Sequence, residues 1–116
     1  MVPRRILLIS ANGIFSLCAS SDGEIRSWNL KSDSMIRRFQ GHTDKVLSVS
    51  ISKDDRRIVS ASSDHSIRLW NTIGDCKHTL QGHKAGINRV RFVPNREGKP
   101  IIVSSSLDNT IKINRL

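Results

Sequence analysis

The chain has 116 residues, 37% hydrophobic and 25% charged, which is the balance of one globular domain and not of a disordered or fibrous protein. Nineteen Lys and Arg against ten Asp and Glu give a net charge of +9, which favours an anionic partner, nucleic acid before a membrane surface or an acidic protein. No apolar run approaches the roughly 20 residues of a membrane-spanning helix, so we expect no membrane span.

The first forty residues predict four strands. The opening MVPRRILLIS weakly resembles a signal peptide, but the apolar run 6–9 is shorter than the minimum of about 7 residues for such a segment, and no small-residue cleavage site follows. We therefore interpret it as the first strand. The four strands are expected at residues 4–10, 14–20, 25–29 and 34–40.

The rest of the chain shows the same pattern with clearer periodicity. Leu47, Val49 and Ile51 alternate with serines, which is the period of two of a half-buried strand. Turn residues 53–55 separate this strand from the next. Further strands are expected at 58–62, 67–71, 76–81, 87–93, 101–106 and 111–114. No stretch has a convincing helical period, so the sequence predicts an all-β protein.

An internal repeat organises these strands. The segments SSDGEIRSWN, SSDHSIRLWN and SSLDNTIKIN recur so that Asp22, Asp64 and Asp108 are spaced by 42 and 44 residues. The tetrapeptides FQGH and LQGH end at His42 and His83, 41 residues apart. A period of about 40–45 residues with Gly-His near one end and Trp near the other is typical of a blade of a WD-repeat β-propeller.

The repeat predicts about two and three-quarter blades, each a four-stranded antiparallel sheet, in an incomplete ring. We expect a first blade at 1–40 without its Gly-His, a complete middle blade at 41–81, and a third blade at 82–116 without its outer strand. Either the chain is a fragment or truncated form, or the remainder of the ring comes from elsewhere. Incomplete propeller ends expose apolar faces, so self-association is expected.

The middle stretch resembles one particular group of WD-repeat proteins. The run WNTIGDC (Trp70 to Cys76), with IRRFQGH before it and RVRFVPN after it, is similar to the receptor for activated C-kinase, a Gβ-like scaffold of the small ribosomal subunit. The resemblance covers nearly the whole chain. It implies a non-catalytic scaffold that links signalling kinases and other adaptor proteins to the ribosome and translation. A Gβ-like or other WD-repeat subunit of a signalling complex, with no ribosome role, is the alternative.

Ser60, His42 and Asp64 superficially form a catalytic Ser-His-Asp set. A nucleophile would need an exposed serine, a base within reach and an oxyanion hole. In WD-repeat families, however, residues at these positions join a tryptophan, here Trp70, in a buried hydrogen-bonded tetrad. The resemblance therefore implies a structural role, and we expect no enzymatic activity.

The other two repeats match this tetrad only in part. The third supplies His83, Ser104 and Asp108, but Asn114 stands where the tryptophan is expected. The first supplies Asp22 and Trp28, with Cys18 in place of the serine and no histidine.

Basic residues gather in the loops expected between the first and second strands of two blades. These loops lie on one rim of a propeller, where the cations form a candidate site for rRNA phosphates; they are Lys53, Arg56, Arg57, Arg96 and Lys99. The alternative is a merely solvated surface. With only five aromatic residues, base stacking is not expected, and any RNA contact should be insensitive to sequence.

The remaining cysteines and histidines give no metal-binding spacing. Cys18 and Cys76 lie far apart; they can in principle pair, but without a secretory signal we expect reduced thiols in the cytoplasm. His65 and His78 have no partner at metal-ligand spacing. No metal or cofactor is expected.

Overall fold

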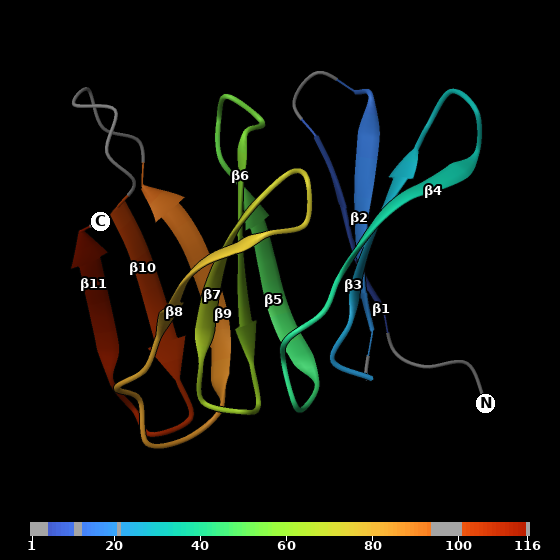
Figure 1. Cartoon of the computed structure of the whole chain (residues 1–116). Coiled ribbons are helices and arrows are strands. Elements are labelled where there is room, and N and C mark those ends of the chain that lie inside the picture. Colours follow the sequence, from blue (N-terminus) through green and yellow to red (C-terminus); the bar gives the residue numbers. More distant parts are fainter. Residues whose placement is uncertain (1–4, 11–12, 21, 94–100, 116) are drawn as a thin grey trace.

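The structure of the chain is a computed structural model that describes residues 5–10, 13–20, 22–93 and 101–115. Three antiparallel sheets follow one another in chain order and stand side by side, with the middle sheet between the other two (Figure 1). All elements in the described ranges are strands, so the all-β prediction is confirmed. Within these ranges there is no helix with the length and apolar character that crossing a bilayer requires.

The first two sheets each contain four strands in sequence order, and the third contains three. The first sheet consists of β1 (Arg5–Ile9), β2 (Phe15–Ser20), β3 (Ile25–Asn29) and β4 (Ser34–Phe39). The second consists of β5 (Val46–Ile51), β6 (Arg57–Ser62), β7 (Ile67–Asn71) and β8 (Cys76–Leu80). The third consists of β9 (Ile87–Val93), β10 (Ile101–Ser106) and β11 (Ile111–Arg115).

Strands β5, β6 and β7 of the middle sheet contribute buried side chains to cores on both of its faces, because side chains alternate across each strand, whereas β8 is mostly exposed. On β6, Ile58 belongs to the core shared with the first sheet, whereas its neighbour Val59 belongs to the core shared with the third. The first core consists of Leu17, Ala19, Ile25, Phe39, Val46, Val49, Ile58 and Trp70. The second consists of Val59, Ala61, Ile67, Leu69, Ile87, Val90 and Ile102. Apolar burial between sheets is thus the main stabilising contribution.

The turn between the second and third strands of each sheet has the same backbone feature. Gly23, His65 and Asn109 each follow the repeated aspartate, and all three have positive φ, at 85°, 73° and 68°. The left-handed region is tolerated best by glycine, and asparagine and histidine are among the residues that adopt it most often after glycine. Gly23 is also closely packed, since an added β-carbon would lie 2.8 Å from the carbonyl oxygens of residues 42 and 44.

The outer face of the third sheet carries apolar side chains, beside Arg89, that nothing covers within the described residues. Ile111 and Ile113 on β11 correspond by repeat to Ile67 and Leu69 on β7. Ile67 and Leu69 are only 2% and 4% exposed because the third sheet covers them. Ile111 and Ile113 are 72% and 60% exposed. Such a face favours association with another apolar surface.

We therefore expect the 116-residue chain to self-associate at micromolar concentration, and Ile113→Lys to weaken that association at least tenfold in sedimentation equilibrium. Burying a lysine ammonium at the contact is unfavourable, while the folded monomer gains only an exposed charge. Ile73→Lys is the matched control, because Ile73 is equally exposed at 63% but lies in the β7–β8 turn. A cooperative monomer at these concentrations would contradict the expectation.

Candidate functional site

The four predicted tetrad residues of the middle repeat meet between the first and second sheets. His42 lies in the segment that joins β4 to β5, Ser60 lies on β6, Asp64 lies in the β6–β7 turn and Trp70 lies on β7. The Nδ1 atom of His42 is 2.9 Å from Oδ2 of Asp64, and its Nε2 atom is 2.6 Å from Oγ of Ser60. The indole Nε1 of Trp70 donates to the same Ser60 oxygen at 2.9 Å.

The chemistry of these groups fixes the direction of each hydrogen bond. An ionised Asp64 can only accept, so Nδ1 of His42 carries the proton and donates. Its Nε2 is then an acceptor for the hydroxyl proton of Ser60. The Ser60 oxygen in turn accepts from the Trp70 indole, so its hydroxyl both donates and accepts. The network is polar, buried and paired throughout, as a stable interior network must be.

Burial and hydrogen bonding stabilise the neutral imidazole and the anionic carboxylate. Burial lowers the pKa of His42 below 6.5, although Asp64 opposes this shift. Burial alone would raise the pKa of Asp64, but hydrogen bonds from the Ser66 hydroxyl, His42 and the backbone N–H groups of Ser66 and Thr43 lower it to about 2.

This arrangement is unsuited to nucleophilic catalysis. The Ser60 side chain is 0% exposed, so no substrate carbonyl can approach it. Its lone pair is directed to the Trp70 indole and its proton to His42. Both requirements of an activated serine, access and an uncommitted oxygen, are therefore missing.

The third repeat forms a similar network without an indole. Nε2 of His83 is 2.9 Å from Oγ of Ser104, and its Nδ1 is 2.9 Å from the Thr110 hydroxyl and 3.5 Å from the Asp108 carboxylate. Hydrogen bonds, first from the Thr110 hydroxyl and next from the Lys84 backbone N–H, lower the pKa of Asp108. Asn114 stands at the tryptophan position, and among the described residues no indole reaches Ser104.

The first repeat does not bring its predicted residues together. The Asp22 carboxylate is half-exposed and pairs with Arg26 at 3.2 Å. Trp28 is only partly buried, whereas Trp70 is 1% exposed. Trp70 is buried against the first sheet, next to Phe39, whereas no described sheet packs on the corresponding face of the first sheet; Cys18 also replaces the serine hydroxyl that would accept from the indole.

The structure adds two hydroxyl groups that the sequence analysis did not single out. Ser66 lies 3.2 Å from Nδ1 of His42 and donates to Asp64, and Thr110 has the same place in the third repeat. The spacing Asp-x-Ser in one repeat and Asp-x-Thr in the other identifies both, whereas the first repeat has Glu24 at this position.

The predicted basic rim is only partly described. Lys53 and Arg56 are exposed in the β5–β6 turn, and Arg57 begins β6. Asp54 in the same turn accepts from the Ser52 hydroxyl and from the backbone N–H of Arg56, and these bonds lower its pKa, so the turn also carries a fixed anion. Arg96 and Lys99 lie outside the described residues. No three potential metal-ligating side chains gather in the part of the chain that the structure describes.

Successive antiparallel sheets that carry this histidine network define the chain as a set of β-propeller blades. The chain matches the family WD40 (WD domain, G-beta repeat) over residues 33–71 and 74–113, and it belongs to this family. Members of the family are generally non-catalytic scaffolds that bind other proteins.

Several curated proteins are similar to this chain along most of its length. It is 50% identical to MST50-interacting protein 11 of Pyricularia oryzae over 91% of the chain and 34% of that protein. It is 36% identical to a guanine nucleotide-binding protein subunit beta-like protein of Encephalitozoon cuniculi over 90% of the chain and 32% of that protein. It is 32% identical to protein tipD of Dictyostelium discoideum over 93% of the chain and 18% of that protein. The chain thus spans about a third or less of the relatives it matches.

The tetrad predicts an order of destabilisation. We expect Trp70→Ala to lower the free energy of unfolding by about 3–5 kcal/mol, because it removes a buried ring and a hydrogen bond, and Asp64→Ala to be similarly severe. Asp22→Ala should cost less than about 1 kcal/mol, as for an exposed ion pair. Urea titration measures all three. Trp28→Ala is the matched control for loss of an indole, and equal losses for Trp28 and Trp70 would refute the ranking.

The His42 pKa also predicts a dependence of stability on pH. The folded-state pKa lies below the unfolded value of 6.5, so the contribution is fully present above pH 6.5 and is lost as the pH falls toward the folded pKa. The slope should reach at most about 1.4 kcal/mol per pH unit. Asp64 adds a second loss between pH 3.8 and about 2.

Urea unfolding at pH 7.5, 6.5 and 5.5 measures the first of these losses. His78→Gln is the control, because His78 is exposed on β8 and its replacement should leave the slope unchanged. A free energy of unfolding that stays constant from pH 7.5 to 5.5 would rule out the buried neutral imidazole.

Proposed function

We propose that the chain is a non-catalytic scaffold that binds signalling kinases and other adaptor proteins, in the subgroup that resembles the receptor for activated C-kinase. The observation that carries this proposal is the state of the Ser60 hydroxyl, which is buried and already makes two hydrogen bonds. Ser60 therefore cannot act as a nucleophile, and its network holds together sheets whose surfaces are available for binding proteins. The relatives support it: one is named as an interacting protein and another as Gβ-like.

The proposal includes an anchor on the small ribosomal subunit in the cytoplasm, with a role in translation. Its basis is the net charge of +9 together with the exposed Lys53 and Arg56 of the β5–β6 turn. Cations on a projecting turn can contact rRNA phosphates, and such contacts release counterions and weaken with salt. Arg57, Arg96 and Lys99 complete the proposed rim.

The second candidate is a subunit of a signalling complex with no ribosome role. Asp54 and Asp55 favour it, because they reduce the net charge of the turn that carries Lys53, Arg56 and Arg57. Co-sedimentation with small ribosomal subunits at low and at high salt separates the two candidates. Salt-sensitive co-sedimentation supports the anchor, and its absence at low salt favours the signalling complex.

The rim predicts a specific loss of ribosome affinity. We expect Arg56→Glu with Arg57→Glu to lower the affinity for the small ribosomal subunit at least tenfold at low salt. The slope of log affinity against log salt should also become shallower, by the amount that corresponds to the loss of about two phosphate contacts. Arg37→Glu with Lys77→Glu makes the same charge change on the exposed edges of β4 and β8 and serves as the control. Equal losses for both pairs would show that net charge, and not the rim, governs binding.

A further inference from the structure

Arg68, on strand β7 of the middle sheet, pairs with no carboxylate within the described ranges. Its polar contact there joins Nη1 to the sulfur of Cys76 at 3.7 Å, which is a weak acceptor. Its Nε is buried and has no hydrogen-bond partner in the same part of the chain. A guanidinium carries five N–H donors, so Arg68 keeps donors for an acceptor from outside the chain.

The corresponding arginine of the first repeat does have acidic partners. Nη2 of Arg26 lies 3.2 Å from the carboxylate of Asp22 and 3.4 Å from that of Glu24. The residue that corresponds to Glu24 in the middle repeat is Ser66, whose hydroxyl donates to Asp64. The middle repeat therefore retains the cation of this pair and lacks its anion.

The guanidinium of Arg68 has a fixed position at the surface. It lies against the segment that joins the first two sheets, because a β-carbon placed on Gly41 would be 2.8 Å from its Nη1 and 3.1 Å from its Cζ. Cys76, which contacts Nη1, is exposed. Thr79, opposite Arg68 in the β7–β8 ladder, is exposed as well. A side chain from another molecule can thus reach the guanidinium from the side of β8.

A carboxylate is the anion that this position favours. The planar fork of a guanidinium matches the two oxygens of a carboxylate, and Glu24 shows within the same chain that a glutamate pairs with an arginine at this place in the repeat. Partial burial also removes water from one side of the Arg68 cation, so an anion beside it is screened less than at a fully solvated arginine.

We propose that Arg68 binds the carboxylate of an acidic side chain on a partner protein. The terminal N–H groups of the guanidinium donate to the carboxylate oxygens, and the partner segment lies over Cys76 and Thr79. That the carboxylate belongs to a protein rests on the proposed scaffold function, whereas the affinity of Arg68 for a carboxylate does not.

Alkylation of Cys76 reports whether the site is occupied, because its sulfur lies beside the guanidinium. The full chain is treated with uncharged iodoacetamide at low salt, and mass spectrometry follows Cys76 separately from Cys18. N-acetyl-tetraglutamate amide should protect Cys76 in a saturable manner, whereas N-acetyl-tetraglutamine amide, which has the same length and no charge, should not. Equal protection by both peptides, or none by the tetraglutamate, would overturn the proposal.

Arg68→Gln is the decisive variant. The tetraglutamate concentration that gives half-protection should rise about fivefold, as expected for the loss of one charge-assisted pair. Arg56→Gln removes the same charge from the exposed β5–β6 turn and should leave protection unchanged. Equal effects of the two substitutions would overturn the proposal, because net charge alone would then explain the binding.

Arg68→Lys is the second variant and decides if Arg68→Gln does not fold. It keeps the charge and the aliphatic stem but loses the fork, so it should also weaken protection, and unchanged protection would count against the proposal. Hexauridylate separates a carboxylate site from a phosphate site. It should protect Cys76 less than the tetraglutamate does, and equal or stronger protection would overturn the assignment to a carboxylate. Ribosome co-sedimentation depends on the rim and not on Arg68, so the two proposals fail separately.

Discussion

Placing one hydroxyl group between two apolar sheets is the constraint on which the middle repeat depends. Ser60 is fully buried, and a buried hydroxyl without partners costs roughly 1–3 kcal/mol. His42 and Trp70, which lie on two different elements, both form hydrogen bonds with this hydroxyl. These bonds fix the positions of the loop before β5 and of strand β7 relative to β6. The ionised Asp64 then orients the imidazole and completes the chain of donors and acceptors.

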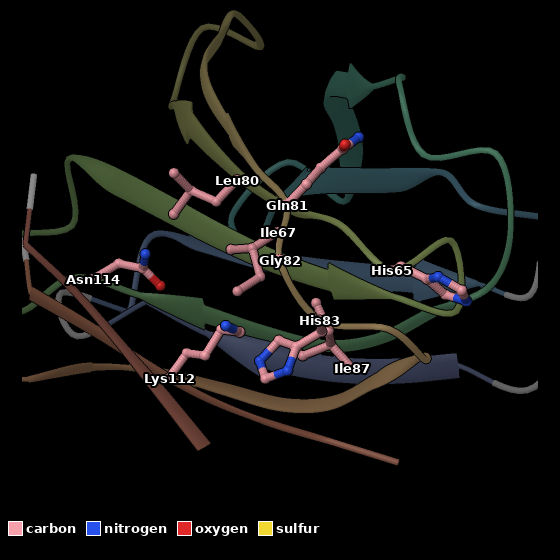
Figure 2. A pocket seen from close by; sticks show the side chains of 9 residues that line it. All are labelled: His65, Ile67, Leu80, Gln81, Gly82, His83, Ile87, Lys112 and Asn114. Atoms are coloured by element: carbon pink, nitrogen blue, oxygen red, sulfur yellow. The ribbon is translucent and has the colours of Figure 1, made fainter. Parts of the chain in front are cut away.

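The third repeat shows how much of this network survives without its last member. His83 keeps its contact with Ser104, and Thr110 supplies a hydroxyl beside Nδ1, so the imidazole is still held at both nitrogens. The packing of the indole is lost while the polar pairing of the histidine is retained, and a shallow open pocket lined by Leu80, Ile87 and Asn114 lies at this place (Figure 2). The two sheets therefore remain packed through Ile67, Ile87 and Ile102.

The sequence predicts the strands and the middle network well because both depend on local patterns. Every strand end lies within one residue of its expected position, since alternation and turn residues are read directly from neighbouring letters. Ser66 and Thr110 were missed because their role depends on a histidine more than twenty residues away. The pocket beside Asn114 could not be predicted from this residue alone, because a missing side chain leaves a space only if neighbouring sheets do not close around it.

The close packing at Gly23 makes the position of the second repeat depend on the turn of the first. The turn of the first sheet rests on the carbonyl groups of residues 42 and 44, which belong to the loop that carries His42 of the next repeat. The network around His42 is therefore positioned partly by the sheet that precedes it. The repeats are not interchangeable modules: exchanging the first two would bring His65, with its side chain and positive φ, to a place where only a hydrogen atom fits.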